Sequence, residues 1–147
     1  LRQLAAGMHN VRFLGRIAPE ELRRYYQHAI ALVVPSECFE TFGIVLIESF
    51  RQGTPVIARR LGPFPEIIAQ SGGGELFTTR DDLLVAMRRL QCDPAHRNAL
   101  SISGYRAYVD RWSERVVVPQ YLDIVRRAAA RRGQMRVIDA LAAQEVA

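Results

Sequence analysis

The sequence contains no lysine, and all 20 of its basic residues are arginine. Against 15 acidic residues they leave a formal net charge of +5. A basic balance permits anionic partners such as nucleotides, nucleic acid or phospholipid surfaces. No aromatic residues alternate with the arginines and no nucleic-acid-binding motif occurs, so nucleic acid is not expected as a partner.

Cysteine is also scarce. Cys38 and Cys92 lack metal-ligand spacing, and no Asp-x-Asp pair or His/Cys/Asp cluster occurs, so no metal site is predicted. Two reduced cysteines are typical of the cytoplasm. No apolar run approaches the roughly 20 residues that span a bilayer. Residues 1–10 do not form a signal peptide, and they lack an initial Met, which indicates trimming or excision from a longer chain.

Short β-rich runs alternate with helical segments, which predicts an α/β fold with an open parallel sheet flanked by helices and a helical C-terminal region. The expected strands are 11–14, 29–34, 54–58 and 75–77, and the expected helices are 19–28, 43–52, 63–69, 81–91, 94–107 and 114–132. A Rossmann-type fold normally opens with a βα unit that carries a phosphate loop. That unit is missing, so the chain is expected to begin inside the fold.

The most informative segment lies between Pro35, which ends a buried strand, and Gly53, which ends a buried helix. Ligands of open α/β sheets bind beyond the carboxyl ends of the strands. The first amides of the expected helix have no acceptor inside it, and Gly43 allows a ligand to approach the backbone closely. The segment therefore predicts a site for phosphate and sugar hydroxyls. Its amides are those of Phe42, Gly43, Ile44 and Val45.

Glu48 lies in the same expected helix among largely apolar neighbours. A carboxylate there is costly unless it is paired or hydrogen-bonded. Two adjacent ribose hydroxyls would satisfy both of its oxygens. The alternative is an interaction with Arg51 or Gln52 on the same face of the helix.

Several short motifs together resemble the signature of glycosyltransferase family 4. They are Pro35-Ser36, Glu40-x-Phe42-Gly43, Glu48 and Gly53-Thr54-Pro55-Val56-Ile57-Ala58, and the resemblance extends through 11–15 upstream and through 62–66 and Trp112-Ser113 downstream. The resemblance covers about residues 1–127. Members of that family have the GT-B fold, in which two Rossmann-like domains face a cleft. They transfer sugars from nucleotide donors with retention of configuration.

The resemblance implies a role for each motif. Glu40 would be the catalytic residue, holding the hydroxyls of the donor sugar and the developing oxocarbenium charge. The amides of 42–45 would bind the sugar and the pyrophosphate, and Glu48 would bind the ribose. The nucleobase would meet the loop formed by Gly15, Arg16 and Ile17. The donor would be UDP- or GDP-linked, with no cofactor and no metal.

Parts of the family pattern are missing or altered. The basic pair that clamps the pyrophosphate would lie upstream of Leu1, and the acceptor domain is absent. Thr41 replaces a usual small residue, and Gly62-Pro63 replaces a double glycine, which leaves the sugar open. Residues 1–132 are therefore interpreted as a partial C-terminal donor-binding domain, N-terminally truncated and inactive without an N-terminal domain in the same or a partner chain. The alternatives are a non-catalytic nucleotide-sugar-binding remnant, an accessory subunit, or a nucleotide-sugar epimerase of the same fold.

Residues 133–147 are expected to form a helical or disordered tail. Five arginines lie in and just before it, namely Arg126, Arg127, Arg131, Arg132 and Arg136. A basic helix can dock on anionic lipid, so peripheral contact with the inner face of the membrane is one interpretation. A solvated helical face is favoured, because no bulky apolar residues lie opposite these arginines over 126–134.

Overall fold

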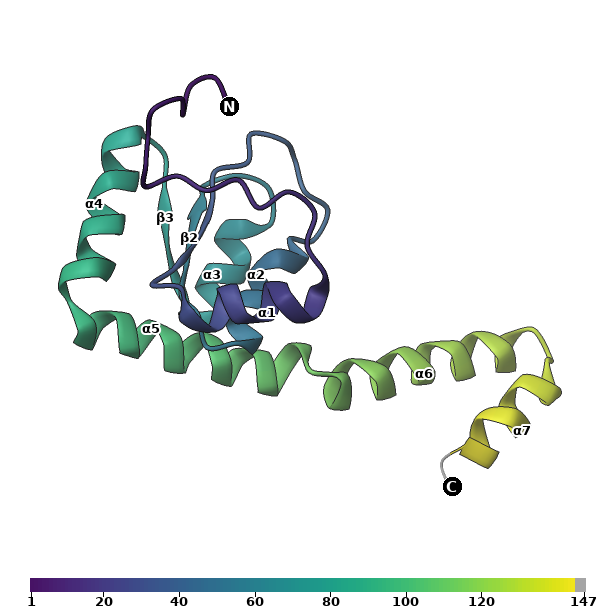
Figure 1. Cartoon of the computed structure of the whole chain (residues 1–147). Helices are drawn as coiled ribbons and strands as arrows, with labels where there is room; N and C mark the ends of the chain where they lie inside the picture. The colour runs from purple at the N-terminus through teal and green to yellow at the C-terminus, as the bar shows by residue number, and fades with distance from the viewer. Residues whose placement is uncertain (145–147) are drawn as a thin grey trace.

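The computed structural model describes residues 1–144 and contains a parallel three-stranded sheet flanked by helices (Figure 1). The strands β1 (Leu32–Val34), β2 (Val56–Arg59) and β3 (Gly74–Phe77) lie in the order β1-β2-β3. Leu32 is opposite Val56, which is opposite Gly74. The sequence-based prediction of an α/β fold with a parallel sheet is confirmed.

The observed helices closely match the predicted ones. They are α1 (Pro19–His28), α2 (Ile44–Arg51), α3 (Phe64–Ser71), α4 (Arg80–Cys92), α5 (Pro94–Ala107), the π-helix η1 (Tyr108–Trp112), α6 (Glu114–Arg131) and α7 (Met135–Gln144). Proline at the first turn and capping residues explain why the starts were predictable. Thr79 and Asp82 form a capping box at α4, and Asp93 accepts a hydrogen bond from the His96 amide at the start of α5.

Alternate residues of β2 face the two sides of the sheet, as strand geometry requires. Val56 and Ala58 pack into the larger core cluster with residues of α2 and α3, whereas Ile57 packs into a second cluster with residues of α4. In α2, Leu46 is 0% exposed and Phe50 is 1% exposed. The prediction that this helix lies deep in the fold is therefore confirmed.

The predicted strand at 11–14 is wrong, because residues 11–18 have no regular secondary structure. Val11, Phe13 and Leu14 are each about 40% exposed. A strand is held by hydrogen bonds to a neighbour, and the described chain places no strand beside this segment. The next predicted strand is shorter than expected: β1 covers only its last three residues, and of these only Val34 is buried, because β1 lies at the edge of the sheet.

The C-terminal helices extend away from the sheet. In Figure 1, α5, η1 and α6 follow one another along one rod, and α6 runs out beyond the α/β part before α7 turns back against it. The predicted tail is helical over Met135–Gln144, and residues 145–147 lie outside the described residues. Within residues 1–144, no helix combines the length and the apolar character needed to cross a bilayer.

Candidate functional site

The carboxyl ends of the three strands meet at one edge of the sheet, and the predicted site residues from Glu40 to Val45 follow β1 there. Glu40 is exposed in the loop 35–43 between β1 and α2. A Cβ placed on Gly62, in the loop after β2, would lie 3.6 Å from both the backbone N and the backbone O of Glu40. The loops after β1 and β2 are therefore in contact, and Glu40 lies at the edge where open α/β sheets bind ligands.

Gly43 sets the direction in which α2 leaves this loop. It is the N-cap of α2 with a φ of 81°, in the left-handed region that glycine tolerates best. It is also buried: a Cβ there would lie 2.9 Å from Cε1 of Phe64 in α3. No side chain caps α2, and within residues 1–144 the amides of 42–45 donate to no protein acceptor. These free amides give the start of α2 the chemistry of an anion site.

Arg59, the last residue of β2, holds the loop 35–43 against the sheet edge. Its Nε donates to the backbone O of Pro35 at 3.2 Å, and its Nη2 lies 3.4 Å from Oε1 of Glu37. Its guanidinium lies 5.1 Å from the centroid of the Phe77 ring. This residue was not predicted from the sequence, because nothing in the order of residues shows that the end of β2 faces the loop after β1.

Glu48 lies one turn inside α2 and is exposed. The Tyr26 hydroxyl, from α1, donates to its Oε2 at 3.3 Å. The alternative expected from the sequence is not formed: Arg51 lies over the Tyr108 ring, 6.0 Å from its centroid, and Gln52 accepts a hydrogen bond from Gln27. Glu48 is therefore connected to α1 rather than to its own helix.

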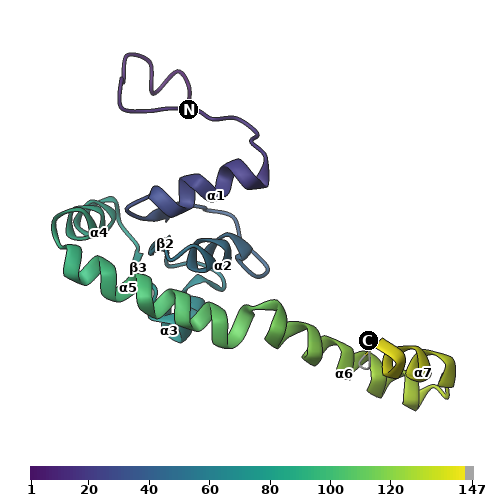
Figure 2. The same ribbon diagram turned by 60° about the horizontal axis from the view of Figure 1, so that its bottom comes forward.

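A cavity of about 130 Å³ separates α1 from α2, which lie side by side in Figure 2. Glu48 and Tyr26 both line it, together with Pro19, Leu22, Arg23, Arg51 and Gln52. Burial, and then the charge and hydrogen bond of Glu48, raise the pKa of Tyr26 to about 12. The tyrosine hydroxyl therefore remains a hydrogen-bond donor throughout the physiological pH range.

The predicted nucleobase loop stands apart from the other site residues. Gly15 has a φ of 69° with nothing within 4 Å of an added Cβ, Arg16 is exposed, and Ile17 is partly buried. Among residues 1–144, no hydrogen bond or ion pair joins this loop to Glu40 or Glu48. It does lead directly into Pro19, which lines the cavity beside Glu48.

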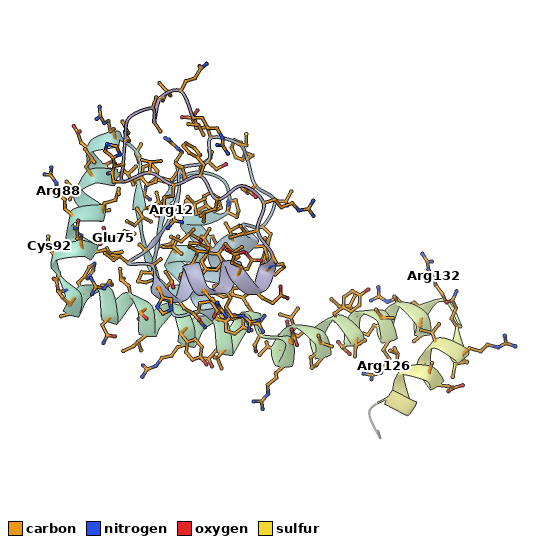
Figure 3. The ribbon with its side chains drawn as sticks, viewed as in Figure 1. Arg12, Glu75, Arg88, Cys92, Arg126 and Arg132 are labelled. Atoms are coloured by element: carbon orange, nitrogen blue, oxygen red, sulfur yellow. The ribbon has the colours of Figure 1, made fainter. Side chains whose placement is uncertain are left out.

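Other candidate chemistry lies away from this edge. Oε1 of Glu75 in β3 lies 2.7 Å from Nε2 of His96, and Nη1 of Arg89 in α4 lies 3.4 Å from the same carboxylate oxygen. Figure 3 places Glu75 beside α4, far from Arg126 and Arg132 on the C-terminal helices. No group of three His, Cys, Asp or Glu side chains in the described part of the chain could hold a metal ion.

These features define an α/β domain of the Rossmann type with a candidate anion site at the carboxyl edge of its sheet. A profile of the family described as Glycosyl transferases group 1 matches residues 2–107. The chain belongs to this family.

Curated relatives with this sequence pattern are sugar transferases. The chain is 38% identical to a D-inositol 3-phosphate glycosyltransferase of Saccharomonospora viridis over 81% of this chain and 28% of that protein. It is 35% identical to the sulfoquinovosyl transferase SQD2 of Arabidopsis thaliana over 68% of this chain and 20% of that protein. The chain thus spans about a quarter of the length of the curated relatives it matches.

Solved structures share the fold. A sucrose-phosphate synthase from Thermosynechococcus elongatus superimposes with a TM-score of 0.79 at 31% identity, over 87% of this chain and 32% of that one. The C-terminal domain of the group 1 glycosyl transferase LpcC from Francisella tularensis gives a TM-score of 0.62 at 25% identity, over 76% of this chain and 58% of that one. Anabaena HepE, solved with UDP, superimposes with a TM-score of 0.71 at 22% identity, over 88% of this chain and 35% of that one. This similarity shows a shared fold and nothing more.

Proposed function

We propose that this chain is the donor-binding part of a retaining GT-B glycosyltransferase of family 4, and that it binds a nucleotide-diphosphate sugar without a metal ion. The observation that carries the proposal is the start of α2, where Gly43 opens a helix whose first amides lack protein acceptors. Two carboxylates flank this start, Glu40 before it and Glu48 one turn after it. Amides suit a diphosphate, and carboxylates suit sugar and ribose hydroxyls.

In this proposal the donor lies across the carboxyl edge of the sheet. The amides of 42–45 donate to the pyrophosphate oxygens, where they also stabilise the charge that develops on the leaving group. Glu48 accepts from the ribose hydroxyls. Glu40 accepts from hydroxyls of the sugar and stabilises positive charge on its anomeric carbon. The nucleobase, of UDP or GDP, meets Gly15, Arg16 and Ile17, whose loop leads into the cavity beside Glu48.

Transfer to an acceptor requires a second, facing domain in this proposal. Glu40 is exposed, and Phe39 beside it is 82% exposed, so the described residues do not close the site against water. A closed site strengthens the electrostatic interactions with the transition state and prevents hydrolysis of the donor. Several relatives named as sugar transferases are about three times as long as the chain, which leaves room for such a domain.

The test compares Glu48→Gln with Glu40→Gln in the full natural chain, by calorimetry with UDP and GDP. Each charge-assisted hydrogen bond contributes roughly 1.5–3 kcal/mol, and 1.4 kcal/mol is about tenfold in affinity. Glu48→Gln should therefore weaken nucleotide binding roughly 10- to 100-fold. Glu40→Gln should spare the bare diphosphate while removing most turnover.

Glu114→Gln is the matched control, because it removes one exposed carboxylate from the first turn of α6, a helix outside the sheet. It should leave nucleotide affinity unchanged. Equal affinities for wild type and a folded Glu48→Gln variant would refute the ribose role. If Glu40→Gln weakened the bare diphosphate as much as Glu48→Gln, the proposed division between the two acids would be wrong.

A further inference from the structure

Glu48 faces a hydroxyl that comes from a different helix. The Tyr26 Oη of α1 lies 3.3 Å from Oε2 of Glu48, and both residues line the cavity between α1 and α2. The other polar residues on the same side of α2 are engaged elsewhere, Arg51 over Tyr108 and Gln52 with Gln27. The orientation of the Glu48 carboxylate is therefore set by Tyr26.

The position of Tyr26 is itself fixed by the fold. Thr54, which is 2% exposed, donates its hydroxyl to the backbone O of Tyr26. In the next residue, Gln27 Nε2 donates to Gln52 Oε1 at 3.0 Å. Two side-chain pairs therefore tie α1 to α2, Tyr26 with Glu48 and Gln27 with Gln52. The backbone that carries the Tyr26 hydroxyl is therefore held by Thr54, and the residue after it is held by Gln52.

A carboxylate can accept about four hydrogen bonds on its two oxygens. Tyr26 uses one of these positions on Oε2, which leaves Oε1 and a second position on Oε2 for a ligand. An exposed glutamate without such a partner samples several rotamers, and ordering it on binding costs conformational entropy. A hydroxyl that holds the carboxylate in one orientation before the ligand binds removes part of that cost.

We propose that Tyr26 is a positioning residue that holds the Glu48 carboxylate ready for the two ribose hydroxyls, and so contributes to the preference for ribonucleotide over deoxyribonucleotide donors. This inference rests on the proposed ribose role of Glu48. The high pKa of Tyr26, caused first by burial and then by Glu48, keeps its hydroxyl protonated, as a donor to a carboxylate must be. Tyr26 acts through Glu48 and touches no reacting atom.

The experiment uses Tyr26→Phe in the full natural chain, because phenylalanine keeps the packing and removes only the hydroxyl. Affinities for UDP, GDP and their 2′-deoxy counterparts are measured by calorimetry. Loss of one hydrogen bond should weaken the ribonucleotides about 3- to 10-fold. The 2′-deoxy nucleotides should change less. If the donor assay is active, the KM for the donor should rise while kcat stays close to wild type.

Tyr25→Phe is the matched control. Tyr25 is the neighbouring residue and is 40% exposed, on another side of α1 where it lines a hollow with Glu21 and His28. Its variant should bind all four nucleotides as the wild type does. The double variant Tyr26→Phe/Glu48→Gln should bind no more weakly than Glu48→Gln alone, because the hydroxyl acts only through the carboxylate.

The outcomes separate this inference from the proposed function. If Glu48→Gln abolishes the ribose preference and Tyr26→Phe matches the wild type, the positioning role is overturned while the proposed function stands. If Tyr26→Phe weakens ribo- and deoxyribonucleotides equally, and does so again in the Glu48→Gln background, Tyr26 is structural and the inference is also overturned. If Glu48→Gln itself has no effect, both fail.

Discussion

Gly43 holds the position where the chain passes from the loop into α2. Its φ of 81° and the 2.9 Å between an added Cβ and Phe64 Cε1 both disfavour any other residue. We expect Gly43→Ala to lower the free energy of unfolding by about 1–2 kcal/mol for the left-handed backbone and by about 1–3 kcal/mol more for overpacking. Urea unfolding measures the change, and nucleotide affinity should fall with it, because α2 must shift.

Gly7→Ala separates the two contributions. Gly7 has the same φ of 81°, but nothing lies within 4 Å of its added Cβ. The variant should therefore lose only the conformational part of the stability. Equal losses for both variants would show that contact with Phe64 plays no part at Gly43.

Tyr26 should ionise at a higher pH than an ordinary tyrosine side chain. Its folded pKa of about 12 exceeds the ordinary value of 10.0, because burial and then Glu48 disfavour the phenolate. A raised pKa means that protonated Tyr26 stabilises the fold below about pH 10, and that this contribution is lost as the pH rises from about 10 to about 12. Ultraviolet titration should show an ionisation step near pH 12 that is absent in Tyr26→Phe. In Glu48→Gln the same step should move toward lower pH, and an unchanged step would contradict the pairing.

At the scale of single residues, the sequence predicts which groups gather at the edge of the sheet. Glu40 and Gly43 follow a strand that ends at Pro35, so the order of residues places them in the loop after β1. Tyr26 and Arg59 could not be predicted, because they reach the site from α1 and from the end of β2 through tertiary contacts. Local sequence carries no information about such pairings.

At the scale of elements, helices with their own start signals were the most predictable. α1 covers the predicted 19–28, with Pro19 at its first turn and two acids after it. A strand is stabilised by hydrogen bonds to neighbouring strands, which its own sequence does not identify. For this reason the predicted strand at 11–14 was wrong. The π-helix at Tyr108–Trp112 was also unexpected. It places Trp112 against Phe50, with ring centroids 6.1 Å apart, so the Trp-Ser motif contributes to packing of the core.

The packing of α5 on the core depends on Gly104. A Cβ there would lie 2.6 Å from Cδ1 of Phe50 and 3.2 Å from Cα of Gly73. In an exposed helix, Gly→Ala would stabilise by about 1 kcal/mol. We expect Gly104→Ala instead to destabilise the fold by about 1–3 kcal/mol, because the overpacking must displace α5. Urea unfolding measures the change in the free energy of unfolding. Ala99→Gly, at an exposed position of the same helix, is the control that changes helix propensity alone. A stabilised Gly104→Ala variant would mean that α5 adjusts freely.

For the whole molecule, stability should differ sharply between the sheet and the C-terminal helices. Val56, Ile57 and Ala58 of β2 are each no more than 1% exposed, whereas in α6 only Ala129 is buried. Hydrogen exchange of the chain should therefore show the slowest exchange in β2 and fast exchange along α6 and α7. Protection of α6 equal to that of β2 would indicate that another surface covers this rod in solution.

The chain by itself is expected to bind nucleotide weakly and to transfer no sugar. The amides at the start of α2 and Glu48 are present, but Glu40 lies in an exposed loop with Phe39 and Phe42, which are 82% and 49% exposed. Such a site admits water, and the described residues provide no opposing surface to hold an acceptor. The measurement follows UDP- and GDP-sugars with the purified chain, scoring both transfer and hydrolysis. Glu40→Gln controls for contaminating transferases, because contaminant activity persists in that variant. Turnover that Glu40→Gln abolishes would contradict the expectation, and would show that this chain assembles a complete active site.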